Sequence, residues 1–309
     1  MKIFDLHQDL MLHMCTRQKY GQSRQTDWGL LEASDIDLLV ATAFPDPAIA
    51  DPFDPFVNTL INKDIDQYHK AIATRDGWCC VRNASDLQRP ERKLLLHIEG
   101  LNTVADTSDS WEQLERWYVD GVRSFGLHWN LTNALGGGTT DPDTTLTDLG
   151  GEVVRWLEER KAVLDLAHSN QATFFAVADI TKRPLLVSHG NVAAVCSSNR
   201  NYSDEQLARI ARSDGVIGVF FAATFTVGEG FATVDRLIDH IDHVVAQVGI
   251  RHVALGSDFG GIISGTLQGI ASVADYSDLP EHLARRGYTS TDIDAITYQN
   301  AERVLRSHL

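Results

Sequence analysis

The chain has 309 residues, of which 43% are hydrophobic, enough to bury a large core in one large or two ordinary domains. Its formal net charge of -15 at pH 7 argues against nucleic acid and anionic membrane surfaces as partners. No apolar run is long enough to cross a bilayer, and the first motif already begins at residue 7, so we expect neither a membrane span nor a signal peptide.

The first predicted element is a strand over Lys2–Leu6, which is followed directly by the motif His7-Gln8-Asp9. Side chains at positions i and i+2 of a strand point to the same face, so His7 and Asp9 are expected to converge just past the end of this strand. An imidazole and a carboxylate at one spot suit a divalent metal such as zinc.

The same spacing recurs at His240 and Asp242. There, the apolar residues of 234–248 recur with helical spacing, and side chains at i and i+2 of a helix diverge. Only the first pair therefore predicts a metal site.

Eight short apolar runs rich in Val, Ile and Leu predict β-strands. They are Lys2–Leu6, Asp37–Ala43, Lys93–Ile98, Gly121–Leu127, Ala162–Leu166, Pro184–Val187, Gly215–Phe221 and His252–Gly256. Their nearly continuous hydrophobicity indicates burial on both faces, as in a parallel sheet that is covered by helices.

Amphipathic stretches lie between most of these runs, and the clearest are Gly150–Lys161, Gln171–Asp179 and Thr233–Val248. Capping-box patterns at Ser110 and Gln113, and at Ser203 and Gln206, predict two helix starts. Eight strand–helix units predict an α/β protein with a (β/α)8 TIM-type barrel. Since no linker, low-complexity segment or repeat is visible, we expect a single domain over residues 1–309.

Ligand-type residues follow several of the predicted strands, at the end of the barrel where active sites form. They are His7, Asp9, Glu99, His168, His189 and Asp258. Each has an ordinary structural explanation, as a hydrogen-bonded core histidine or a turn carboxylate. Burying all six at one barrel end without a metal would be costly, so together they predict a metal-dependent active site.

The four cysteines show no C-x-x-C spacing, and the adjacent Cys79 and Cys80 make a poor disulfide framework. Cys15 and Cys196 complete the set. This usage predicts a reduced, cytoplasmic compartment.

The motifs together resemble the zinc-dependent membrane (renal) dipeptidases, in particular their bacterial branch. The resemblance covers nearly the whole chain, in order, through His7-Gln8-Asp9, Ile98-Glu99-Gly100, Gly121-Val122-Arg123, Asp165-Leu166-Ala167-His168, Ser188-His189, Cys196–Asn201, Gly256-Ser257-Asp258-Phe259 and Asn300–Leu305. It implies a (β/α)8 barrel with two Zn²⁺ ions per chain and a small dipeptide as substrate. Members of the family are often homodimers, which extends to this chain only by analogy.

The resemblance also implies roles for individual residues. His7, Asp9 and Glu99 would hold one ion, while Glu99, His168 and His189 would hold the other, so that Glu99 bridges the pair. Asp258 resembles the family's acidic residue, which transfers a proton from the nucleophile to the leaving amine. Arg200 resembles the arginine that binds the substrate's carboxylate terminus. The alternative for Arg200 is a surface arginine that closes a loop.

The chain departs from the mammalian family pattern at two places. Trp129 stands where mammalian members have a histidine after the fourth strand, and His128 precedes it. Because adjacent residues at a strand end point to opposite faces, His128 is either a substitute in substrate binding or a core histidine. After the seventh strand, Phe220–Ala223 lacks the tyrosine expected in the mammalian enzymes.

Three functions remain in competition. The first is a dinuclear zinc dipeptidase, whose resemblance to its family implies tolerance of a C-terminal D-residue. The second is an amidohydrolase-type enzyme acting on N-acyl amino acids, cyclic amides or lactones, although such barrels usually open with H-x-H. The third is an inactive barrel that serves as a binding protein, but no expected ligand is missing to support it.

Overall fold

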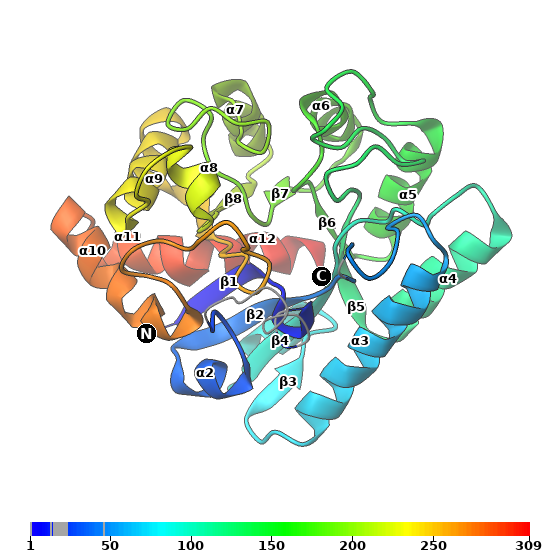
Figure 1. The fold of residues 1–309 in the computed structure, drawn as a ribbon, viewed down its shortest axis with the longest axis horizontal. Helices are drawn as coiled ribbons and strands as arrows, with labels where there is room; N and C mark the ends of the chain where they lie inside the picture. The colour runs from blue at the N-terminus through cyan, green and yellow to red at the C-terminus, as the bar shows by residue number, and fades with distance from the viewer. Residues whose placement is uncertain (1, 13, 15–23, 46) are drawn as a thin grey trace. The chain divides into compact units, whose positions relative to one another are not determined.

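The computed structural model describes residues 2–12, 14, 24–45 and 47–309 (Figure 1). Cys15 lies outside the described residues. The chain packs as two compact units, and each is described by itself. The first unit comprises Met1–Leu39 and Val187–Val304, and the second comprises Val40–Leu186 and Leu305–Leu309.

The first unit is built on parallel strands. Strand β1 (Ile3–Gln8) pairs with β9 (Val253–Leu255), with Asp5 opposite Leu255, and β9 pairs on its other side with β8 (Val216–Val219). The further elements of this unit are α2 (Trp28–Ala33), α7 (Asp204–Arg212), α8 (Ala223–Val227), α9 (Val234–Val248), η2 (Ile250–His252), η3 (Val273–Asp278), α10 (Leu279–Arg286), α11 (Ser290–Asp294) and η4 (Ala295–Gln299).

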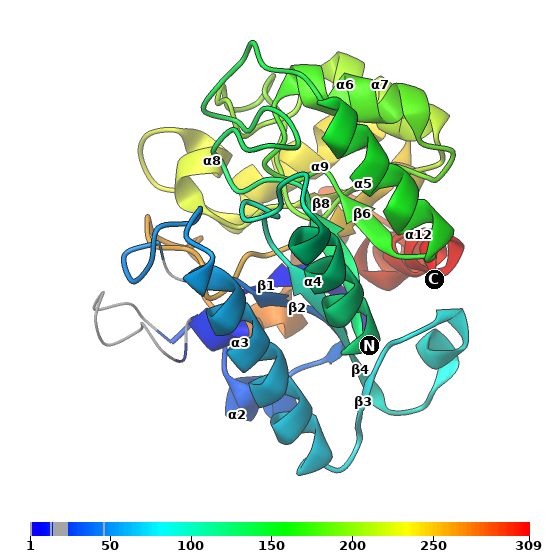
Figure 2. The ribbon, with the colours of Figure 1, turned by 90° about the vertical axis from the view of Figure 1, so that its right-hand side faces the viewer.

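The second unit contains four parallel strands that pair in chain order. They are β3 (Trp78–Cys80), β4 (Arg92–Ile98), β5 (Val122–Gly126) and β6 (Val163–Asp165). The helical elements of this unit are α3 (Phe56–Ala73), η1 (Ala84–Gln88), α4 (Ser108–Val119), α5 (Asp148–Glu159) and α6 (Gln171–Ile180). Helices α3 and α4 lie side by side (Figure 2), and the indole of Trp117 donates to Oδ1 of Asn62, 2.8 Å away.

The alternation of parallel strands and helices is that of a (β/α)8 barrel, which confirms the predicted fold class. All eight predicted strands are present, each end within two residues of its predicted position, and β3 is an additional strand that the prediction missed. Two of the three places where the chain divides into units fall inside β2 (Ile36–Ala43) and β7 (Leu186–Val187), not in linkers. Helix α12 (Asn300–His308) likewise contributes residues to both units.

Most of the predicted helix signals are correct. Ser203 caps α7 in a capping box with Gln206, and α9 spans the periodic segment after Thr233. The predicted start at Ser110 is wrong, because Thr107 caps α4 and its hydroxyl accepts a hydrogen bond from the Ser110 backbone N–H. Threonine caps by the same chemistry as serine, and the backbone of Thr107 is extended, as is typical of an N-cap residue.

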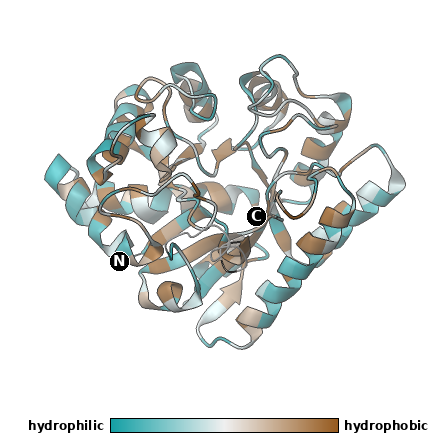
Figure 3. Cartoon of the chain, in the orientation of Figure 1, coloured by the Kyte–Doolittle hydropathy of each residue, from teal (hydrophilic) through white to brown (hydrophobic). Residues whose placement is uncertain are grey.

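Hydropathy follows this architecture (Figure 3). The strands carry the hydrophobic residues, and β1 and β5 are buried at every position. The helices are amphipathic: in α9 the buried positions include Leu237, Ile241 and Val244, which share one helical face. Within the described ranges, no helix is long and apolar enough to cross a bilayer.

Candidate metal centre

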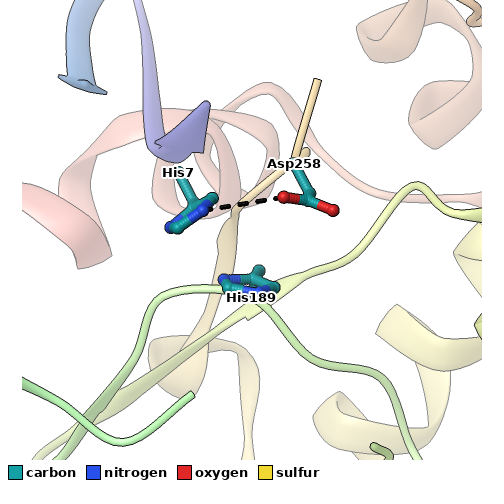
Figure 4. A group of neighbouring side chains, drawn as sticks. All are labelled: His7, His189 and Asp258. Atoms are coloured by element: carbon teal, nitrogen blue, oxygen red, sulfur yellow. Dashed lines mark ion pairs between the residues drawn. The ribbon is translucent and has the colours of Figure 1, made fainter. Parts of the chain in front are cut away.

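Two strand ends of the first unit carry His7, Asp9 and Asp258, and backbone hydrogen bonds join them. The Asp258 N–H donates to the His7 carbonyl at 3.0 Å, and the Asp9 N–H donates to the Phe259 carbonyl at 2.9 Å. This pairing continues the β1–β9 ladder past the regular strands. Nε2 of His7 consequently lies 3.6 Å from Oδ1 of Asp258 (Figure 4). It also lies 3.7 Å from Oδ2 of Asp9.

His189 enters the same group from the end of β7, where two glycines allow a close approach. A Cβ at Gly218 or Gly256 would lie 2.0 or 1.8 Å from the Ser188 carbonyl oxygen, so only glycine fits at either position. The rings of His7 and His189 are 4.1 Å apart. Nδ1 of His189 lies 2.9 Å from the Ser188 hydroxyl, which suits metal binding through Nε2.

These residues fit a divalent metal. One potential ligand atom from each of His7, His189 and Asp258 lies within 4.8 Å of the other two, and the three side chains face one another (Figure 4). Two imidazoles and a carboxylate, all largely buried, are the donor set that zinc prefers.

The second unit brings together Glu99, which follows β4, and His168, which follows β6. Nε2 of His168 lies 2.9 Å from Oε1 of Glu99, and both side chains are buried. Nδ1 of the same ring lies 2.8 Å from Oδ1 of Asn130. An imidazole and a carboxylate in direct contact also suit a metal site, because a divalent cation stabilises the carboxylate that burial disfavours.

Backbone strain marks both groups. In the described part of the chain, five non-glycine residues have positive φ, and three of them are Asn130 (53°), His168 (64°) and Asp258 (62°). Such conformations cost about 1–3 kcal/mol each and cluster at functional sites. The strain therefore points to the same residues as the ligand chemistry does.

The two residues at the predicted substrate-binding position differ in burial. His128 is completely buried, its Nδ1 lies 3.1 Å from the Ser169 hydroxyl, and burial lowers its pKa from 6.5 to about 4. Trp129 is half-buried, and its ring centroid lies 5.0 Å from that of Phe44 and 6.5 Å from that of His168. This geometry favours the core-histidine alternative for His128 and puts Trp129 beside the His168 ring.

Arg200 is only 5% exposed, so the surface-arginine alternative does not fit. Its guanidinium carbon lies 5.6 Å from the Phe220 ring and 5.9 Å from the Phe225 ring, and these two rings stack on each other. Phe220 in turn lies edge-on to His189 at 5.2 Å. The guanidinium thus lies beside a stacked pair of aromatic rings, one of which contacts the candidate ligand His189.

Comparison with known families decides the identity of the chain. The family model described as membrane dipeptidase (peptidase family M19) matches residues 1–308. The chain belongs to the membrane dipeptidase family. This membership makes it a hydrolase of the metallo-dipeptidase class, as the resemblance implied.

Two curated relatives illustrate the range of the family. The chain is 33% identical over 238 residues to an uncharacterized protein from the pqqA 5′ region of Klebsiella pneumoniae, covering 73% of this chain and 87% of that protein. It is 31% identical over 227 residues to an uncharacterized dipeptidase of Schizosaccharomyces pombe, covering 72% of this chain. The match spans about half of that longer protein, 54% of its length.

A solved structure supports the fold. A metallopeptidase from Rhodobacter sphaeroides, liganded with a phosphinate mimic of the dipeptide L-Ala-D-Ala, superimposes with a TM-score of 0.85 over 100% of this chain and 99% of that one. The two sequences are 24% identical. The fold of that metallopeptidase therefore extends over the full length of this chain.

Proposed function

We propose that the protein is a dinuclear zinc dipeptidase that hydrolyses the amide bond of dipeptides, including those with a C-terminal D-residue. The observation that carries this proposal is the convergence of two ligand-type residues, His7 and His189, with Asp258, the proposed proton carrier, in a chain of the membrane dipeptidase family. The contact between Glu99 and His168 is a second pair of ligand type and supports a second ion.

The proposed ligand sets share one carboxylate. His7, Asp9 and Glu99 would hold one ion, and Glu99, His168 and His189 would hold the other. When bound, such a pair of ions supplies an activated water and polarises the carbonyl of the substrate. Hydrogen bonds at Nδ1 of His168 and His189 support this assignment, because they orient Nε2 of each ring for metal binding.

Asp258 is the proposed proton carrier. Its carboxylate takes one proton of the attacking water and gives it to the amide nitrogen as the peptide bond breaks, while the OH group stays on the carbonyl carbon, which yields two free amino acids. The left-handed backbone at Asp258 and its N–H bond to the His7 carbonyl hold the carboxylate toward the ligands. Its side chain is 14% exposed, so it is shielded but not sealed from solvent.

Arg200 is the proposed anchor for the substrate's free carboxylate. A buried guanidinium beside a stacked pair of aromatic rings gains from pairing with a carboxylate that displaces water. A fixed anchor sets one distance to the metal centre, so only the amide one residue from the C-terminus reaches it. The dipeptide mimic bound by the Rhodobacter sphaeroides relative supports a substrate of this size, and its D-Ala half supports a C-terminal D-residue.

We further propose a cytoplasmic location. Cys79, Cys80 and Cys196 are free thiols, which is usual for a reducing compartment.

A hydrolysis screen with metal quantification tests this function. We expect the zinc-loaded enzyme to cleave L-Ala-L-Ala and L-Ala-D-Ala, and to act poorly on a tripeptide, on a dipeptide amide and on N-acetyl amino acids. Arg200→Ala should raise KM and remove the preference for a free carboxylate, whereas Arg200→Lys should keep part of it.

Other outcomes would favour the alternatives. Turnover of N-acetyl amino acids or lactones without dipeptide cleavage would support the hypothesis of an amidohydrolase-type enzyme. Metal binding without turnover of any of these compounds would support the hypothesis of an inactive binding protein. Equal rates on a dipeptide and its amide would refute the carboxylate anchor.

A further inference from the structure

The carboxylate of Asp5 is hydrogen-bonded to the backbone of His7, and neither the family motifs nor the proposed chemistry uses it. Asp5 lies in β1 two residues before His7 and is completely buried. We propose that Asp5 is a positioning residue that fixes the ends of β1 and β9 against each other, and with them His7 and Asp258. This inference rests on the proposed function, because it assigns Asp5 a role in that reaction.

The side chain of Asp5 accepts five hydrogen bonds, all within the first unit. Oδ1 accepts from the backbone N–H groups of His7, at 3.3 Å, and Ser257, at 2.9 Å. Oδ2 accepts from the Gln8 amide at 2.6 Å, the Ser257 hydroxyl at 2.6 Å and the Tyr276 hydroxyl at 2.7 Å. Four of these donors therefore come from the two segments that carry His7 and Asp258.

The network continues to both sides of Asp258. The Ser257 hydroxyl accepts from the Phe259 N–H at 3.1 Å, so the residues before and after Asp258 are both fixed. On the other strand, Oε1 of Gln8 accepts from the Thr26 hydroxyl at 2.8 Å. Because Asp258 itself has a strained φ of 62°, its neighbours must hold it in place.

The chemistry of the network indicates positioning more than net stabilisation. A carboxylate buried without a cation is costly, and no ion pair to Asp5 exists among the described residues. An apolar side chain in this place would remove the charge but leave these five donors without their acceptor. A carboxylate has two acceptor oxygens, so it can bind backbone and side-chain donors of two strands at once. In this way it orients the candidate ligand His7 and the neighbouring Asp258.

The nearest substitute for Asp5 is asparagine, which has almost the same shape. It replaces one acceptor oxygen with an N–H₂ donor, which then faces groups that also donate. Ser257 or Gln8 must move, and the segment that carries Asp258 moves with Ser257. The expected consequence is a displaced carboxylate at Asp258 and a weaker ligand at His7.

The test compares Asp5→Asn and Ser257→Ala with Asn300→Ala in the full-length, zinc-loaded enzyme and in its apoprotein. Asn300 is a matched control, because it is also buried and holds the opposite end of β9 by donating to the Val253 carbonyl at 2.9 Å. The readouts are zinc affinity of the apoprotein by chelator competition, kcat and KM per folded protein, and Tm.

We expect both site variants to lose about 10- to 100-fold in kcat or zinc affinity, with little change in KM, as is usual for residues that orient ligands. Asn300→Ala should lower Tm alone. The inference is overturned if Asp5→Asn lowers only Tm, or, should that variant not fold, if Ser257→Ala does so. A wild type that cleaves no dipeptide overturns the proposed function instead, whereas the zinc-affinity readout still decides the role of Asp5.

Discussion

Asn130 orients the imidazole of His168 through a hydrogen bond, in which Oδ1 of Asn130 lies 2.8 Å from Nδ1 of the ring. The same oxygen accepts from the Thr139 hydroxyl at 3.0 Å, so it is an acceptor toward both groups. The proton of a neutral His168 is therefore on Nδ1, and Nε2, which lies 2.9 Å from Glu99, is the atom for a metal.

Removing the Asn130 side chain should weaken metal binding. Asn130→Gly keeps the left-handed backbone, since glycine adopts a φ of 53° without strain, and so isolates the loss of the acceptor. We expect a loss of about 10- to 100-fold in zinc affinity or kcat. Asn130→Asp keeps an acceptor oxygen and should retain most of both. Chelator competition and steady-state kinetics measure the two, and wild-type zinc affinity in the glycine variant would contradict this role.

Glu99→Ala should lose both zinc ions, because the proposed site shares this one carboxylate between them. The matched control is Glu115→Ala, which removes a half-exposed carboxylate from α4 that pairs with Arg160 at 2.6 Å. Elemental analysis after dialysis should give about two zinc equivalents in the control and close to none in the variant. A Glu99→Ala protein that keeps one tightly bound ion and normal hydrolysis would show that Glu99 is not shared.

Asp258→Asn should retain the metals while kcat falls, by roughly a hundredfold or more, because asparagine cannot carry the proton. The amide is nearly isosteric, so the hydrogen bond from the residue 258 N–H to the His7 carbonyl should remain. Zinc content and kcat are measured on the same preparation. Loss of zinc in parallel with activity would instead make Asp258 a metal ligand.

Gly261→Ala should disrupt the site through shape alone. A Cβ there would lie 2.3 Å from Oδ2 of Asp9 and 2.9 Å from Oδ1 of Asp258, and neither carboxylate can move without leaving the ligand group. We expect activity to fall strongly. Gly151→Ala is the control, because its nearest contact would be an ordinary 3.6 Å inside α5, where alanine favours the helix. Full activity in the Gly261 variant would falsify this close packing.

The sequence predicts the barrel well, because burial on both faces makes each barrel strand a continuous apolar run. Strand β3 could not be predicted in this way, because it is only three residues long. Its sequence, Trp78-Cys79-Cys80, shows neither an aliphatic run nor an alternation of polar and apolar residues. Residues of ligand type are also visible in the sequence, since chemistry requires His, Asp or Glu directly after a strand.

The residues that support the ligands could not be predicted in the same way. Asn130 acts on a histidine 38 positions away, and Asp5 binds Ser257 across 252 positions. In the sequence, Asn130 is one polar residue in a loop, and Asp5 is an interruption of an apolar strand. Their roles follow from packing, which brings their oxygens to donors that no local pattern identifies.

Two buried histidines that are not among the candidate ligands should make the apoprotein sensitive to acid. Burial, with hydrogen bonds to backbone carbonyls opposing it, lowers the pKa of His240 and of His308 from 6.5 to about 4. Each folded-state pKa is below the unfolded value, so the stabilisation is fully present above pH 6.5. It is lost as the pH falls toward 4, because the unfolded chain then binds protons that the folded chain refuses.

His308 offers a direct test, because its Nε2 lies 2.8 Å from the Pro184 carbonyl and glutamine can still donate there. Between pH 6.5 and 4.5 the free energy of unfolding should fall with pH, and each such histidine contributes up to about 1.4 kcal/mol per pH unit. In His308→Gln this slope should be shallower by up to about 1.4 kcal/mol per pH unit, which corresponds to one proton fewer taken up on unfolding. Above pH 7, the free energy of unfolding should depend on pH in the same way in both proteins. Urea unfolding of both apoproteins at a series of pH values measures the slopes. Identical slopes would mean that His308 is protonated to the same extent in the folded and unfolded chains.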